Sequence, residues 1–338
     1  MGSAILAAIL SAAALPASAG PGSTAGNFLK VGVGARPVAL GEAYTALADD
    51  LNAVYYNPAG LAFLERQEVT LMHNKFFEGV SQQFGAYAFP SAKIGTFAGA
   101  FTLLSVEAFN AYDNFDTPAG KVSASDLAGA GAWAFEMPGL NGVALGGSFK
   151  YIHSRLATYT AGSAAVDFGM LYRQAEDGGW SLGVAARNVG TNMRFIDEEY
   201  PLPITGHVGA AYRGGLAPMW ADASYTFLME AVGPRDRDPY AATGIEFRPV
   251  DEFALRAGWR QNQDAGIGLS AGIGFTSLEG GFTGDWWPEI SLDYAFVDHG
   301  ELEATHRISM TLRFGTPKAQ RREGELKRPP KFHHLIRH

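Results

Sequence analysis

The chain has 338 residues, 42 glycines, no cysteine and a formal net charge of −8. After residue 20 no run reaches the roughly 18 uninterrupted apolar residues that a membrane-spanning helix needs, which excludes a helical membrane protein. The acidic chain also lacks the basic surface that nucleic acid requires, so we expect no nucleic-acid partner.

Residues 1–19 predict a secretory signal peptide. Ala4 to Leu15 form an apolar run, and Ala17-Ser18-Ala19 provides the small-x-small cleavage site before Gly20. A short buried helix is the alternative interpretation. The break at Pro16 and the cleavage site after it favour export across an inner membrane, although no Lys or Arg precedes the apolar run.

Residues 20–66 do not alternate like a strand and predict a leader followed by a compact, part-helical segment. Pro37 is suited to the first turn of a helix. The apolar face of this helix is expected to consist of Val38, Leu40, Tyr44 and Leu47. Asp49 and Asp50 mark where the helix should end, and Tyr55–Gly60 predicts a second break.

From Gln67 to Phe314 apolar and polar residues alternate in about fourteen segments of roughly ten residues, which is typical of an antiparallel transmembrane β-barrel. In the last segment Ile308 and Met310 share one face and Ser309 lies on the other, because successive side chains of a strand point to opposite sides. A large water-soluble β-protein is the alternative. The predicted strands are Gln67–Phe77, Gln82–Phe89, Ile94–Val106, Asp126–Met137, Gly142–His153, Tyr159–Arg173, Trp180–Val189, Ile204–Arg213, Met219–Leu228, Tyr240–Arg248, Phe253–Gln261, Gly266–Thr276, Glu289–Val297 and Thr305–Phe314.

The connections between these strands alternate in length. Short ones are Pro90–Lys93, Pro138–Asn141 and Pro249–Glu252, and long ones are Glu107–Ser125, Gly190–Pro203 and Met229–Pro239. Bacterial barrels pair short periplasmic turns with long external loops, so the pattern predicts a location in the bacterial outer membrane, in contact with lipid. Ser277–Pro288 is an exception, because it is long on the side where the connections should be short.

Charged residues of the strands are expected to face the lumen. A Lys or Arg on the lipid face near the midplane costs roughly 2–4 kcal/mol, whereas lumen water or an ion pair satisfies the same group. The predicted lumen-lining residues are Arg187, Arg256, Arg260, Asp293, Arg307 and Arg313, together with Asp167, Asp222 and Glu246. Residues 315–338 are basic and predict a flexible, solvated tail.

Motifs for enzyme chemistry are weak in this sequence. Gly268–Gly272 matches the G-x-S-x-G nucleophile elbow around Ser270, but that motif needs a strand, a sharp turn and a helix, and the residues after Ser270 favour a strand. Gly32-Val33-Gly34 is followed by Pro37 where a dinucleotide fingerprint has its third glycine. With no cysteine and no cluster of His and carboxylates at ligand spacing, we expect no metal, no cofactor and no enzymatic activity.

Two separated parts of the chain resemble a known family. Phe28–Asp50 and Tyr55–Ala62 near the N-terminus, with Leu292–Phe296, Gly300–Leu302 and Thr305–Ser309 near the C-terminus, are similar to the PorV/PorQ branch of the FadL-type outer-membrane barrels. The resemblance implies a fourteen-stranded barrel with the N-terminal segment folded inside as a hatch.

The resemblance also implies two alternative functions. FadL-type members pass hydrophobic small molecules toward a lateral opening in the wall, whereas PorV-type members serve the type IX secretion system and receive the C-terminal signal domains of secreted cargo. On the first alternative the hatch gates the lumen. The hatch residues expected on the ligand path are Phe28, Arg36, Tyr55, Tyr56, Asn57, Pro58, Ala59 and Gly60. A plain turn at Asn57–Gly60 is the competing interpretation, since Pro and Gly both favour turns.

Overall fold

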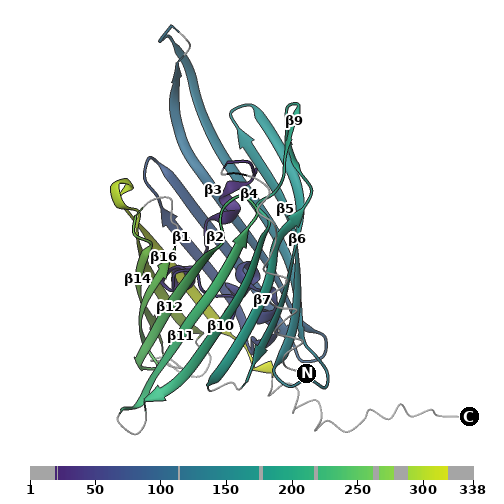
Figure 1. The fold of residues 1–338 in the computed structure, drawn as a ribbon, viewed down its shortest axis with the longest axis vertical. Helices are drawn as coiled ribbons and strands as arrows, with labels where there is room; N and C mark the ends of the chain where they lie inside the picture. Colours follow the sequence, from purple (N-terminus) through teal and green to yellow (C-terminus); the bar gives the residue numbers. More distant parts are fainter. Residues whose placement is uncertain are drawn as a thin grey trace, which may run out of the picture.

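Fourteen strands close into an antiparallel barrel around the N-terminal segment (Figure 1). The computed structural model describes residues 20, 22–112, 115–174, 178–216, 220–261, 266–277 and 288–318, without the side chains of 111, 112, 119 and 220–222. No helix within these ranges is long and apolar enough to cross a membrane. The predicted signal peptide, most of Ser277–Pro288 and most of the predicted tail lie outside the described residues.

The barrel strands correspond one by one to the fourteen predicted segments, so the predicted fold class is confirmed. Their bounds are β1 Gln67–Lys75, β2 Val80–Ser91, β3 Gly95–Tyr112, β4 Pro118–Glu136, β5 Val143–Leu156, β6 Tyr159–Arg173, β7 Gly179–Gly190, β10 Thr205–Leu216, β11 Trp220–Pro234, β12 Tyr240–Val250, β13 Phe253–Arg260, β14 Leu269–Thr276, β15 Glu289–Asp298 and β16 Ala304–Phe314. The first and last strands close the barrel with Gln67 opposite Phe314 and Lys75 opposite His306.

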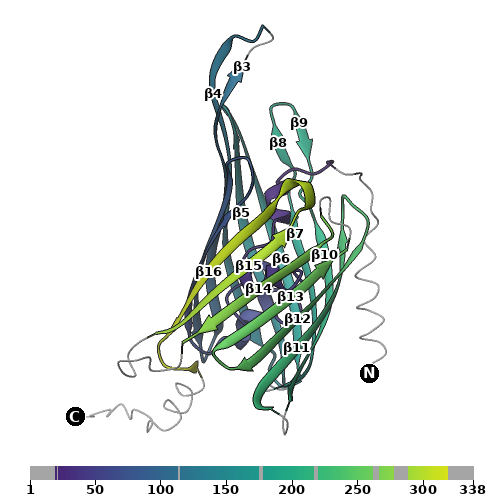
Figure 2. The ribbon, with the colours of Figure 1, turned by 90° about the vertical axis from the view of Figure 1, so that its left-hand side faces the viewer.

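Two predicted long loops are wrong in part, because strands run far into them. Residues Phe109 and Val122 still pair between β3 and β4, and this hairpin projects well beyond the barrel rim (Figures 1 and 2). Likewise β11 continues to Pro234, which shortens the predicted loop Met229–Pro239. Outside the membrane both faces of a hairpin meet water, so the alternation that identifies a spanning strand is lost although backbone pairing continues.

The predicted connection Gly190–Pro203 contains a small hairpin of its own. Its strands are β8 Met193–Phe195 and β9 Glu198–Tyr200, which pair only with each other. Consequently β7 pairs directly with β10 in the barrel wall. Figure 2 places this hairpin at the same end of the barrel as the projecting β3–β4 hairpin.

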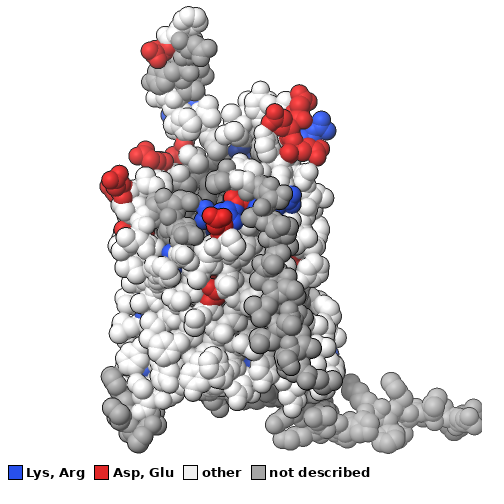
Figure 3. All heavy atoms as spheres, viewed as in Figure 1, with Lys and Arg blue, Asp and Glu red and all other residues white. Residues whose placement is uncertain are grey.

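The two faces of the wall differ as the alternation predicts. On β13 Trp259 is 40% exposed and points outward, whereas Arg256 is only 6% exposed and points into the lumen. On the visible face in Figure 3, charged side chains gather at the upper end, and the described wall below them is mostly uncharged. An uncharged outer band with charges inside is what a lipid-facing barrel requires.

The N-terminal segment folds inside the barrel, and we call residues 28–64 the hatch. Its helices are η1 Asn27–Lys30, α2 Ala35–Ala39, α3 Ala53–Tyr56 and η2 Pro58–Phe63; a further short helix, η3 Gly300–Leu302, lies between β15 and β16. The structure confirms a helix with Pro37 in its first turn, but the predicted extent to Leu47 is wrong, because α2 ends at Ala39 and Gly41 and Glu42 adopt positive φ angles of 67° and 63°. The turn that follows still buries Tyr44 and Leu47.

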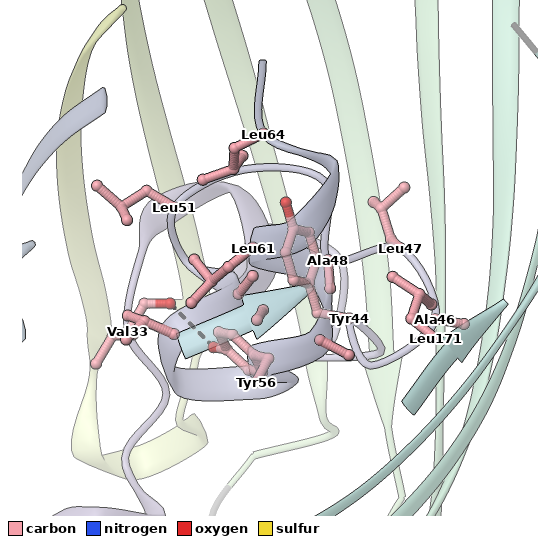
Figure 4. Close-up of a cluster of buried hydrophobic side chains, with 14 of the residues drawn as sticks. Val33, Tyr44, Ala46, Leu47, Ala48, Leu51, Tyr56, Leu61, Leu64 and Leu171 are labelled. Atoms are coloured by element: carbon pink, nitrogen blue, oxygen red, sulfur yellow. Dashed lines mark hydrogen bonds between the residues drawn. The ribbon is translucent and has the colours of Figure 1, made fainter. Parts of the chain in front are cut away.

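The hatch has its own apolar core (Figure 4). The rings of Tyr44 and Tyr56 meet edge to face with centroids 5.4 Å apart, and the Tyr56 hydroxyl donates to the Val33 carbonyl at 2.9 Å. Leu61 and Leu171 are fully buried beside them, the latter from strand β6. The hatch core therefore continues into the wall, and burial of these side chains stabilises the docked position.

Candidate functional site

The hatch backbone rests directly on glycines of the wall. A Cβ added at Gly169 of β6 would lie 1.9 Å from Asn57 Oδ1, and one added at Gly258 of β13 would lie 2.0 Å from the Gly41 nitrogen. Similar close approaches occur at Gly146 of β5. Because no larger residue leaves room for the hatch at these positions, the wall is shaped to receive it.

Asn57 is an anchor between hatch and wall. Its Nδ2 donates to the Thr45 carbonyl at 2.8 Å and to the Met170 carbonyl of β6 at 3.2 Å, while its Oδ1 accepts from the Ala59 nitrogen at 3.1 Å. Pro58, Ala59 and Gly60 follow in η2 and are buried against the wall. The structure thus has a capped turn at this motif, as the competing interpretation expects, and a gating role for Asn57–Gly60 stays a prediction.

A buried ionic network fastens the other side of the hatch. Arg36 donates through Nε to Glu246 of β12 at 2.9 Å and through Nη1 to Asp49 at 2.6 Å. Glu246 also accepts from Arg256 at 2.6 Å, and Arg256 in turn binds Asp293 of β15 at 2.6 Å. Each of these buried charges is therefore paired, as such groups require, and the Arg36–Glu246 pair joins the hatch to the wall.

The six predicted charged lumen residues fall into two groups. Arg256, Asp293 and Arg313 line a lower cavity of about 360 Å³ together with Arg36 of the hatch. Arg313 pairs there with Glu68 at 3.0 Å and Glu289 at 2.6 Å. The other three, Arg187, Arg260 and Arg307, line a separate upper cavity of about 480 Å³. Of the other lumen predictions, Asp167 and Glu246 are buried, and the side chain of Asp222 lies outside the described ones.

The upper cavity lies between the hatch and the wall on the side of the projecting loops. Tyr56 is the predicted hatch residue that reaches it, and Glu42 adds a carboxylate that pairs with Arg260 at 2.8 Å. Sequence reasoning missed Glu42 and His207, which also lines this cavity. An acidic residue next to Gly41 in an otherwise apolar stretch was the available signal for Glu42.

Phe28 and Tyr55 border a small gap of about 30 Å³ behind strands β3 to β5. A groove of about 540 Å³ lies on the outside of the same wall. Gly131 forms the bottom of this groove, between the outward-pointing rings of Trp133 and Phe149. The wall between gap and groove consists largely of alanine and glycine. The ladder between β3 and β4 is continuous there, from Thr96–Ala134 to Val106–Ala124, so the wall is closed.

A β-bulge on β7 shapes this region. The register between β6 and β7 shifts between Val166 and Phe168, so that Arg187 and Asn188 both become buried opposite one residue. The backbone nitrogen of Asn188, at φ 59°, donates to Asp167 Oδ1 at 2.7 Å. Asp167 also pairs with Lys150 at 2.8 Å. Arg187 points inward by alternation, and the bulge turns Asn188 into the lumen beside it, which alternation alone does not predict.

Ser270 lies within β14, and its Oγ accepts from the Gly41 nitrogen of the hatch at 3.2 Å. Ser270 is followed by six further residues of the same strand, so it lacks the strand–turn–helix setting of a nucleophile elbow. Among the described residues no group of three or more His, Asp or Glu is placed to hold a metal ion.

An ion-pair clasp joins the leader to the loop between β11 and β12. Asp236 accepts from Thr24 Oγ1 at 2.6 Å and pairs with Lys30. Burial alone would raise the pKa of Asp236, but the hydrogen bonds from Lys30 and Thr24 lower it below the ordinary 3.8. A carboxyl whose pKa is lowered on folding stabilises the fold above its ordinary pKa, and this contribution is lost as the pH falls through the lowered value.

We therefore expect residues 22–30 to lose amide-exchange protection, after correction for intrinsic rates, when the pH is lowered from 5 through the lowered pKa of Asp236. Asp236→Asn should make protection of this segment weak at both pH values. Protection that is the same in the wild type at low and high pH would show that the clasp does not hold the leader.

Comparison with known proteins agrees with this architecture. The profile of an uncharacterised protein family, UPF0164, matches residues 3–166. No curated protein matches the chain in sequence. Among solved structures, the Pseudomonas putida toluene transporter TodX superposes with a TM-score of 0.55 at 12% identity, covering 84% of this chain and 99% of that one.

Two further structures give similar values. The Ralstonia pickettii toluene transporter TbuX has a TM-score of 0.52 at 12% identity, covering 85% of this chain and 98% of that one. The monoaromatic hydrocarbon channel CymD has a TM-score of 0.53 at 11% identity, covering 84% and 97%.

These likenesses show the class of fold alone: the chain is a closed β-barrel that superposes on these three barrels over most of its length. A closed barrel of fourteen strands with the N-terminal segment inside is the fold that the sequence resemblance implies. Membership of the PorV/PorQ branch, and a role in type IX secretion, stay predictions from the sequence.

Proposed function

We propose that this chain is an outer-membrane channel for the passive passage of hydrophobic small molecules, with the hatch as its gate. The observation that carries the proposal is a closed, lipid-facing barrel whose internal hatch leaves a cavity of about 480 Å³, the size of a small-molecule site. The fold that the chain shares with proteins named as toluene transporters and monoaromatic hydrocarbon channels supports it.

The wall of β3 to β5 is the part best suited to a lateral exit. The gap beside Phe28 and Tyr55 lies inside it, the groove at Gly131 lies outside it, and Asp167 borders both. Alanine and glycine give this part of the wall little side-chain bulk, so the two spaces join once the backbone ladder between neighbouring strands parts. A hydrophobic molecule leaving here would enter the lipid without crossing water.

Gly131→Trp tests this route. Gly131 faces outward with no heavy atom within 4 Å of an added Cβ, so the indole fills the groove without disturbing the barrel. We expect wild-type protein to increase the uptake of N-phenylnaphthylamine by intact bacteria. The variant should lower that uptake about tenfold, because a bulky ring occupies the exit.

Ala257→Trp is the matched control. Ala257 also points outward, on β13, away from the groove. Uptake should stay at the wild-type level in this variant. Equal uptake by wild type, Gly131→Trp and bacteria without the protein would contradict the proposed function.

A further inference from the structure

The upper cavity is positively charged inside an acidic protein. Among the described residues that line it, the cationic side chains are Lys30, Arg187, Arg237, Arg260 and Arg307, and the carboxylates are Glu42 and Asp236. The whole chain has a formal net charge of −8. The lining of this cavity therefore carries an excess of positive charge, although the chain as a whole is negatively charged.

Two of these arginines form no direct ion pair with a carboxylate in the described part of the chain. Lys30 pairs with Asp236 and Arg260 with Glu42, and Arg237 has a partner of its own. Arg187 and Arg307 instead contact main-chain oxygens: Arg187 Nη1 donates to the Tyr55 carbonyl at 3.4 Å and Arg307 Nη1 to the Gly32 carbonyl at 3.3 Å.

Both guanidinium groups are deeply buried and incompletely bonded. Arg187 is 6% exposed and Arg307 is 3% exposed. The Nε of each is buried with no hydrogen-bond partner in the structure. Asp167 acts electrostatically on Arg187, and Glu42 on Arg307, but neither carboxylate forms an ion pair with the arginine. An unpaired buried donor is costly, so each group favours an anion that enters the cavity.

The other residues that line the cavity indicate what kind of molecule carries the anionic group. The guanidinium fork binds carboxylate and phosphate oxygens in pairs, more strongly than it binds neutral acceptors. The remaining lining includes apolar and aromatic surface from Leu29, Phe76, Val232 and Tyr240. A cavity of about 480 Å³ accommodates a small organic molecule rather than a bare ion alone.

We propose that Arg187 and Arg307 form a binding site for an oxyanion group, a carboxylate or a phosphate, carried by a small molecule with an apolar body. This inference rests on the proposed function, because it names the chemistry that the channel recognises on its outer side. It also distinguishes this chain from a channel for unsubstituted hydrocarbons.

Equilibrium binding to the purified full-length protein in neutral detergent tests the site without requiring transport. The probe is 4-fluorobenzoate observed by ¹⁹F NMR, and 4-fluorotoluene is the neutral probe of nearly the same shape. We expect the benzoate to bind more tightly than the toluene. Arg187→Gln and Arg307→Gln should each weaken benzoate binding about tenfold, because each removes a charge-assisted hydrogen bond.

Two further variants keep the test decisive. Glu42→Gln should tighten benzoate binding, since it removes the carboxylate that competes for the cavity's positive charge. Arg194→Gln removes one positive charge from the exposed β8–β9 hairpin and should leave binding unchanged. A properly closed barrel is verified for each variant by heat-modifiable migration on gels.

A competition experiment adds inorganic phosphate to the protein with bound 4-fluorobenzoate. Displacement of benzoate by phosphate would support a site for oxyanions in general, and failure to displace it would support a carboxylate site. Equal binding of both fluorinated probes, or benzoate binding that neither arginine substitution weakens, would overturn the inference. Neither result would depend on the uptake measurements, so the site and the proposed channel can fail separately.

Discussion

Replacing Arg36 with Met should release the hatch while leaving the barrel closed. The substitution keeps an unbranched side chain but removes the guanidinium that binds both Glu246 and Asp49. Glu246 then keeps only arginines of the wall and loses its ionic contact with the hatch. Removing one partner of a buried ion pair typically costs about 3–5 kcal/mol. Amides of residues 33–64 should therefore exchange at least about a hundredfold faster, while the exchange of the barrel strands stays as in the wild type.

Arg248→Met is the matched control, because Arg248 binds the same Glu246 at 3.2 Å from a partly exposed position. An exposed pair contributes about 0–1 kcal/mol, so hatch exchange should change little in this variant. If Arg36→Met and Arg248→Met had equal effects on the hatch, the buried network would not be what holds it.

The strand pattern was predictable from the sequence because lipid imposes a strict rule. A charged side chain such as that of Arg256 must point into the lumen, and an apolar ring such as that of Trp259 can point to the lipid. Every spanning segment therefore shows the alternation. Where lipid is absent the rule weakens. Alternation therefore predicts a loop for the projecting part of β3 and β4 around Phe109, where the structure has paired strands.

The hatch was harder to predict, since its conformation depends on the wall. Gly41 and Glu42 end α2 with positive φ angles at a place where Gly258 admits the backbone. Nothing in the local sequence identifies Gly258 as the partner, because the contact joins residues more than two hundred positions apart. Tyr44 and Leu47 are buried as predicted although the predicted helix does not extend to them. Their burial follows from their apolar character and does not depend on helical periodicity.

The predicted lumen charges reached the lumen, but their grouping needed the structure. Arg187, Arg260 and Arg307 come from three separate strands and meet at one cavity through the curvature of the barrel. Arg256, Asp293 and Arg313 meet at another. The bulge that turns Asn188 inward beside Arg187 also has no sequence signature of its own.

A reversible cross-link between hatch and wall should close the channel. A Cβ added at Gly209 of β10 would lie 3.3 Å from the Ala46 Cβ of the hatch, close to the roughly 3.5–4.5 Å that a disulfide spans. The chain has no cysteine, so Ala46→Cys with Gly209→Cys forms a single defined bridge. The bridge holds the hatch at the wall whatever happens to its ionic contacts.

Uptake of N-phenylnaphthylamine by intact bacteria carrying this double variant, compared before and after reduction, tests the gating hatch most directly. Oxidised protein should show uptake no faster than bacteria without the channel, and reduction should restore the wild-type rate. Each single-cysteine variant should be insensitive to the same reductant. Uptake that is equally fast with the hatch locked and unlocked would contradict a gate that must move.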